Sequence, residues 1–240
     1  YGKIDYYPLR WSESFFTPSS FYSTVAMNPI IYFYHTLKYK ELEYDQKEVA
    51  KSFPAISQYL KISDKNKALD FSRKFLEKKQ NPKPNIVIIV LESLAFEKTS
   101  MAHFALNPTP FLNKISQESW YFPNCYSPTE ATARGLFTIL TGMPDMSQKD
   151  SSSRNPKLTT QNLLMNQFKD FEKYYFLGGS ASWGNIRSLF TKNIDNINLF
   201  EENRYSSPRV DVWGISDYDL FSEALSIFTK QDQAKPFVAI

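Results

Sequence analysis

The sequence has 240 residues, of which 42% are hydrophobic and 16% aromatic, so it can form a full hydrophobic core and is not a disordered chain. A formal net charge of +3 is nearly neutral and does not suggest a dedicated nucleic-acid-binding protein, which would show a concentrated basic face. The single cysteine, Cys125, excludes an internal disulfide and a cysteine-rich zinc site.

The two ends of the chain do not have the features of natural termini. The chain begins at Tyr1 without a signal peptide, and no apolar run approaches the roughly 18 residues that span a bilayer. The last residues, from Pro236 to Ile240, resemble the opening of a core strand, and domains seldom stop inside one. We therefore expect both ends to be cuts in a longer natural protein.

Residues 1–80 are predicted to be an N-terminal extension and linker. Residues 1–23 are aromatic and irregular, and helices are predicted over 24–39, which Pro29 begins or interrupts, and over 45–59, which Pro54 breaks. His35 is interpreted as a packed or surface histidine. Residues 61–84 contain eight Lys or Arg and three Asp or Glu, which indicates either a solvated helix and linker or a segment near an anionic membrane.

The stretch from Asn85 to Glu92 is predicted to be the first core strand of a domain over 81–240. Six consecutive apolar residues, five of them β-branched, follow Pro84, a pattern typical of a parallel strand that is buried on both faces. Ligands of such sheets collect beyond the carboxyl ends of the strands, where Glu92 lies. Glu92 is thus either a solvent-exposed end of the strand or part of a site.

The rest of the chain alternates between predicted helices and strands. Thr109 and Pro110 begin a helix whose Phe111, Leu112 and Ile115 face the sheet. Short strands are expected at 120–122 and 174–177, helices at 132–141 and 159–168, and a further strand from 236. Ser216 is expected to cap another helix, whose apolar stripe consists of Leu220, Phe221, Ala224, Leu225 and Phe228. This alternation predicts an α/β fold with a mostly parallel sheet.

The segment after Tyr126 places hydroxyl groups and Arg134 at the start of the predicted helix 132–141. Unpaired N–H groups at a helix N-terminus stabilise an alkoxide or a phosphoryl oxygen. Thr132 alone is a poor nucleophile and needs a metal ion or a base, and Glu92 could supply an oxygen ligand to that metal. An ordinary N-cap is the alternative interpretation of Thr132.

An ordered set of segments resembles the sulfatase-like phosphoglycerol transferases of the alkaline phosphatase superfamily, which include the lipoteichoic acid synthases. The segments, whose similarity is collinear over almost the whole chain, are residues 1–11, 85–93, 109–112, 132–135, 140–144, 177–187 and 213–221. The resemblance implies a three-layer α/β/α sandwich that is incomplete at the C-terminus. It also implies membrane helices before residue 1, and a catalytic domain that faces the periplasm or the cell exterior from the inner membrane.

The resemblance further implies roles for individual residues. Thr132 would be the nucleophile that takes a phosphoryl group from a phospholipid and passes it to a glycan or polyol hydroxyl. Glu92 and Thr132 would bind a divalent cation, Mg²⁺ or Mn²⁺, with Zn²⁺ as an alternative. The transferred head group would be bound by side chains with suitable donors and an aromatic wall, namely Trp183, Asn185, Arg187 and Arg134. Apart from the resemblance, Trp183 could equally be a core aromatic and Arg187 a surface arginine.

Departures from the family pattern keep further functions open. Ser180 stands where the family often has an acidic residue, and the Asp-His pair and the His expected downstream of Pro236 are absent, so a protein that ends at Ile240 should be inactive. A sulfatase is disfavoured because no Cys or Ser lies four residues before Arg134 with a proline between them. A phosphoethanolamine transferase, which usually has several disulfides, and a binding-only domain also remain open.

Overall fold

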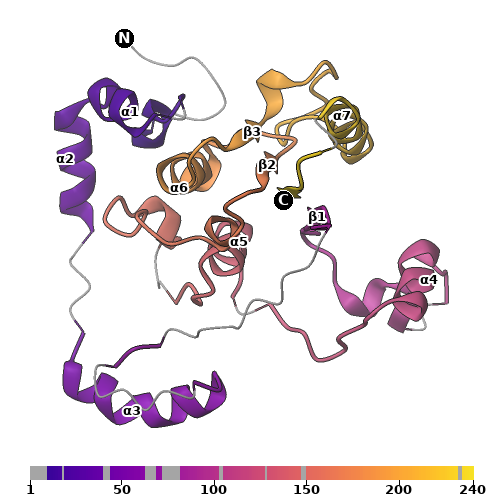
Figure 1. Ribbon diagram of the computed structural model, residues 1–240, viewed down its shortest axis with the longest axis horizontal. Helices are drawn as coiled ribbons and strands as arrows, with labels where there is room; N and C mark the ends of the chain where they lie inside the picture. Colours follow the sequence, from indigo (N-terminus) through magenta and orange to yellow (C-terminus); the bar gives the residue numbers. More distant parts are fainter. Residues whose placement is uncertain are drawn as a thin grey trace.

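A computed structural model of the 240-residue chain describes residues 10–17, 19–39, 44–62, 69–71, 82–102, 105–127, 129–146, 150–231 and 234–240 (Figure 1). Its sheet consists of four strands in the order β1-β4-β2-β3, and every neighbouring pair is parallel. The strands are β1 (Ile86–Val87), β2 (Glu172–Phe176), β3 (Asn198–Phe200) and β4 (Phe237–Ala239). The predicted α/β fold with a parallel sheet is confirmed.

Helices cover both faces of this sheet (Figure 1). One face packs against α5 (Thr132–Thr141) and α6 (Ile186–Asn193), and contributes Val238 and Tyr175 to the larger core cluster. The opposite face presents Tyr174 and Phe237 to α7 (Asp217–Lys230). Alternate residues of one strand point to opposite faces, so β2 and β4 take part in both cores. The three-layer arrangement follows from this double coverage.

The N-terminal region consists of η1 (Trp11–Ser14), α1 (Ser20–Ala26), α2 (Pro29–Lys38) and α3 (Gln46–Tyr59). Pro29 begins α2, and the Asn28 side chain caps it by accepting from the N–H groups of Ile30 and Ile31. The prediction that Pro54 breaks the next helix is wrong, because α3 continues through it. None of the described helices has both the length and the hydrophobicity that a bilayer span requires.

The end of α2 is fastened to the body of the protein through Asp150. Lys38 Nζ and the Tyr39 hydroxyl both donate to Asp150 Oδ2, at 3.0 and 3.3 Å. The hydrogen bond from Lys38 lowers the pKa of Asp150, and burial together with Asp150 raises the pKa of Tyr39 to about 12. Both groups therefore keep the protonation states that hold α2 in place near neutral pH.

Several elements predicted from the sequence are absent from the structure or pack differently, because the local pattern of apolar residues does not determine tertiary packing. The helix α4 (Pro110–Glu118) begins at Pro110 as expected, but Phe111 is 70% exposed and Ile115 is 41% exposed, so this side does not face the sheet. Residues 120–122 form no strand, and the span 159–168 contains only the short η5. The 3₁₀ helices are η2 (Phe96–Lys98), η3 (Ser100–Ala102), η4 (Ser152–Arg154), η5 (Leu164–Gln167), η6 (Trp183–Asn185) and η7 (Glu202–Arg204).

The first strand is also shorter and more exposed than predicted. β1 covers two residues, its only sheet partner in the described part of the chain is β4, and Val87 and Ile89 are more than half exposed. The expectation of a strand buried on both faces is wrong for this structure. β1 lies at the edge of the described sheet with one neighbour, and Val87, Ile89, Val90 and Leu91 are 42% to 57% exposed.

Candidate functional site

The structure brings Glu92 and Thr132 into direct contact although 40 positions separate them in the sequence. Glu92 lies five residues after β1, beyond its carboxyl end, and Thr132 is the first residue of α5. The Thr132 hydroxyl donates a hydrogen bond to Glu92 Oε1. The acid that follows β1 and the hydroxyl that begins α5 thus meet at the carboxyl-terminal end of the sheet.

The helix α5 is held by the core, which fixes the position of Thr132. Its apolar side consists of buried residues that belong to the larger core cluster, namely Ala133, Leu136, Phe137 and Leu140. Ala131 precedes the helix and accepts backbone hydrogen bonds from Arg134 and Gly135. Ala131, the N-cap residue, has no side chain that can cap the helix, and Thr132 lies in the first turn, where the N–H groups carry partial positive charge.

Unusual backbone conformations flank both residues of the contact. Ser93, which follows Glu92, has φ +55°, and Ala131, which precedes Thr132, has φ +72° and ψ 137°. Non-glycine residues rarely adopt positive φ, and such positions are concentrated at functional sites. The chain therefore holds the acid and the hydroxyl in place with backbone geometry that is locally unfavourable.

Arg134 lies on the first turn of α5, two residues after Thr132, and is partly exposed. In the part of the chain that the structure describes, its guanidinium forms no ion pair or hydrogen bond. An arginine at this place can meet a bound anion without giving up an existing partner.

The segment with Trp183, Asn185 and Arg187 approaches the start of α5 through Gly184. A Cβ added to Gly184 would lie 3.0 Å from the Ala133 Cβ, so η6 is in contact with the residue after Thr132. Trp183 packs against the larger core cluster, in agreement with a core aromatic. Its position beside α5 is also compatible with a wall of the site.

Asn185 and Arg187 are already engaged by other parts of the chain. Asn185 is 4% exposed and its Oδ1 accepts from Ser12 Oγ at 2.9 Å. The Arg187 guanidinium donates to both carboxylate oxygens of Glu201, at 2.7 Å each, and to Glu13 at 3.1 Å. A substrate phosphate that binds Arg187 would therefore have to compete with two carboxylates or displace the N-terminal segment.

Three residues that contact the predicted head-group residues could not be predicted from the sequence, namely Ser12, Glu13 and Glu201. Glu201 follows β3, a three-residue strand without a clear sequence signal, and its carboxylate also accepts from the Ala181 N–H at 2.8 Å. Glu13 and Ser12 lie more than 170 residues before their partners. Contacts between such distant positions leave no local pattern in a single sequence.

The donor atoms at the Glu92–Thr132 contact suit a hard divalent cation, because both are oxygens. Two ligands make only part of a site, and no group of three His, Cys, Asp or Glu residues that could hold a metal ion exists among the described residues. The residues present therefore fit one side of a Mg²⁺ or Mn²⁺ site.

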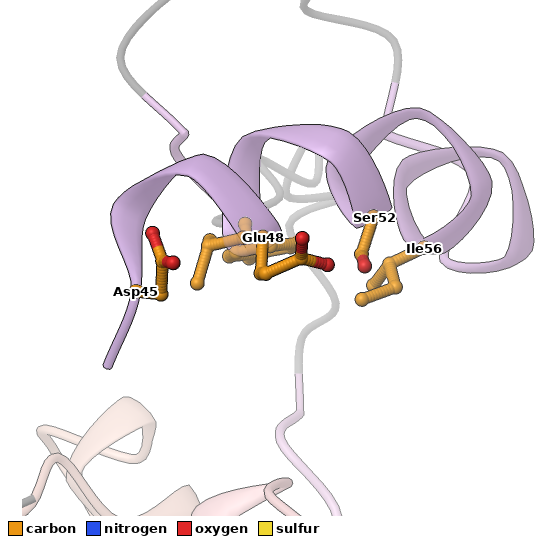
Figure 2. A pocket seen from close by; sticks show the side chains of 6 residues that line it. Asp45, Glu48, Ser52 and Ile56 are labelled. Carbon is orange, nitrogen blue, oxygen red and sulfur yellow. The ribbon is translucent and has the colours of Figure 1, made fainter. Parts of the chain in front are cut away.

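The hollow that Figure 2 shows on α3 is separate from this contact. It has a volume of about 400 Å³, and its lining residues are Asp45, Glu48, Val49, Ser52, Ile56 and Phe71. None of the predicted site residues belongs to this lining, so the hollow is not part of the candidate site.

Two comparisons with known proteins bear on this geometry. The family model described as Sulfatase matches residues 84–240, which include Glu92 and Thr132. The fold is also similar to the crystal structure of a protein in the alkaline phosphatase superfamily from Vibrio parahaemolyticus, with a TM-score of 0.63 and 25% sequence identity. That similarity covers 82% of this chain and 48% of the other, so the chain spans about half the length of the protein it matches.

Proposed function

The chain belongs to the sulfatase family, and on this premise we propose that it transfers a phosphoglycerol group from a phospholipid to an acceptor hydroxyl, with Thr132 as the nucleophile. The observation that carries the proposal is the hydrogen bond from the Thr132 hydroxyl to Glu92 at the start of α5. A hydroxyl becomes a useful nucleophile when a base or a cation favours its ionised form. Both Glu92 and the N-terminus of α5 act in that direction.

The first chemical step forms a bond between Thr132 Oγ1 and the donor phosphorus while the bond from phosphorus to the diacylglycerol oxygen breaks. The hydroxyl proton of Thr132 passes to the Glu92 carboxylate, which already accepts its hydrogen bond. Solvent supplies a proton to the departing oxygen, so diacylglycerol leaves as an alcohol. Phosphoglycerol then remains as a diester on Thr132.

The second step regenerates the threonine. An acceptor hydroxyl of a glycan or polyol attacks the phosphorus and its proton passes to solvent, which balances the proton that solvent gave to the diacylglycerol oxygen. The bond from phosphorus to Thr132 Oγ1 breaks, and the threonine oxygen regains its proton from Glu92. Arg134 has no partner among the described residues and is suited to bind an oxygen of the transferred phosphate. Trp183, Asn185 and Arg187 are proposed to contact the glycerol part once Arg187 releases an acidic partner.

Enzymes of this family generally use a divalent metal, and Glu92 and Thr132 are the residues that would hold it here. When bound, Mg²⁺ or Mn²⁺, or alternatively Zn²⁺, neutralises phosphate charge and favours the ionised hydroxyl.

The proposed donor is a membrane lipid, so the protein is proposed to lie at the inner membrane and to face the periplasm or cell exterior. The exposed side chains of α1 and α2 support this placement. Phe21, Val25, Ile30, Phe33 and Leu37 are between 62% and 78% exposed. The sequence contains no Asp or Glu between Phe15 and Lys40 that an anionic surface would repel.

Mass spectrometry of the protein in its natural length, after incubation with Mn²⁺ and different donors, tests the proposed function. Phosphatidylglycerol is expected to add one phosphoglycerol group to the peptide that contains Thr132. An adduct from phosphatidylethanolamine instead would identify a phosphoethanolamine transferase, and turnover of an aryl sulfate without any adduct would identify a sulfatase. No adduct and no turnover, with binding of the lipid alone, would contradict the proposal and identify a binding-only protein.

A further inference from the structure

A hollow separate from the Glu92–Thr132 contact lies between the N-terminal region and α6. It has a volume of about 250 Å³, and residues from η1, α1, α2, α6 and the segments next to them line it. Its walls are mostly apolar and include three aromatic rings, and the apolar lining residues are Trp11, Phe15, Met27, Pro29 and Tyr32. Thr24 and Lys192 are its polar lining residues.

The aromatic rings hold one another in place around this hollow. Trp11 packs edge-to-face on both Phe15 and Tyr32, with ring centroids 6.0 Å apart in each pair. Trp11 and Phe15 are only 5% and 4% exposed, so the wall is anchored to the body of the protein. A preformed apolar wall favours an apolar ligand because little order is lost on binding.

Lys192 gives this apolar hollow a single positive charge. It lies in the last turn of α6, and its Nζ donates to Thr159 Oγ1 at 3.3 Å. In the part of the chain that the structure describes, no carboxylate forms an ion pair with it. Burial lowers the pKa of Lys192, which means that its surroundings disfavour the charged form. A ligand anion placed beside Nζ would remove that penalty.

We propose that this hollow binds an anionic amphiphile, with a carboxylate or phosphate beside Lys192 and the first carbons of an alkyl chain against Trp11 and Tyr32. A polar anion alone would gain nothing from the apolar wall, and a neutral alkyl chain would leave the Lys192 charge without a counter-ion. The volume limits the bound part to a short segment. The remainder of a longer chain would extend along α1 and α2, which carry exposed apolar side chains such as Phe21 and Ile30.

Isothermal titration calorimetry with eight-carbon probes of different head groups tests this proposal. Monomeric octanoate and octyl phosphate are expected to bind, and octanol and octylammonium of the same chain length to bind at least about tenfold more weakly. Lys192→Met should weaken octanoate by a similar factor and leave octanol unchanged. Lys230→Met, which removes an exposed lysine from α7, should change neither affinity.

Two further variants keep the result interpretable if Lys192→Met does not fold. Lys192→Arg should retain octanoate binding, and Met27→Trp should fill the hollow and abolish binding of all four probes. Flotation with phosphatidylcholine vesicles, with and without an anionic lipid, shows whether the anionic head group can also come from a membrane. Equal affinity for octanoate and octanol, unchanged octanoate affinity in Met27→Trp, or no binding of octanoate at millimolar concentration would overturn the proposal.

Discussion

Replacing Thr132 by alanine is expected to lower the rate of phosphoglycerol transfer by roughly three to six orders of magnitude, because the covalent intermediate can no longer form. The adduct on the peptide that contains position 132 should disappear from the mass spectrum. The fold should persist, since the buried side of α5 consists of other residues, such as Leu136 and Phe137. Transfer of labelled glycerol phosphate from phosphatidylglycerol is the rate measurement.

Two matched variants separate loss of the nucleophile from damage to the helix. Thr132→Ser keeps a hydroxyl and should retain the adduct at a reduced rate. Thr141→Ala removes a hydroxyl from the last turn of the same helix, where it donates to the Phe137 carbonyl, and should leave transfer unchanged. Transfer at the normal rate in Thr132→Ala would rule out the threonine as the nucleophile.

Replacing Gly214 by alanine is expected to lower the free energy of unfolding by about 2–6 kcal/mol, through unfavourable backbone geometry and a steric clash. Gly214 has φ +112°, and an added Cβ would lie 1.8 Å from the Gly178 carbonyl oxygen. Backbone atoms cannot move aside as a flexible side chain can. The loop 211–214 and the turn after β2 would therefore separate, and Ile215 would lose its hydrogen bond to Gly178.

Gly135→Ala is the control for this substitution. Gly135 lies inside α5, has ordinary helical geometry, and has no atom within 4 Å of an added Cβ. Alanine should be neutral there or stabilise the protein by up to about 1 kcal/mol. Chemical denaturation of both variants measures the difference, and equal stability of Gly214→Ala and the unmodified protein would show that the close approach to Gly178 is wrong.

Elements with strong local signals could be predicted from the sequence. The helix 132–141 agrees with α5 at both ends, and the Ser216 hydroxyl caps α7 by accepting from the Asp219 N–H, as its sequence indicates. The strand after Pro236 is β4, which lies between β1 and β2 in the sheet. By contrast, β3 has three residues, and the start of α6 depends on positive φ at Gly184 and Asn185. Features that short, or that depend on the backbone alone, give no periodic pattern.

The candidate site was predictable to the extent that topology brings its parts together. A residue beyond a core strand and a residue that opens the next helix meet at the carboxyl end of a parallel sheet, and Glu92 and Thr132 do so. The ion pairs of Arg187 with Glu13 and Glu201 could not be predicted in this way. They depend on how the N-terminal region packs on α6, which no local sequence pattern specifies.

Anomalous diffraction from crystals that contain Mn²⁺ is the most direct measurement of whether the acid and the hydroxyl share one cation. The structure and the proposed chemistry predict a single anomalous peak about 2.0–2.6 Å from both a Glu92 carboxylate oxygen and Thr132 Oγ1. The peak should be lost in Glu92→Gln. Saturating Mn²⁺ with no peak between these two residues, or with a peak bound only by other side chains, would contradict the assignment of Glu92 and Thr132 to one metal-dependent site.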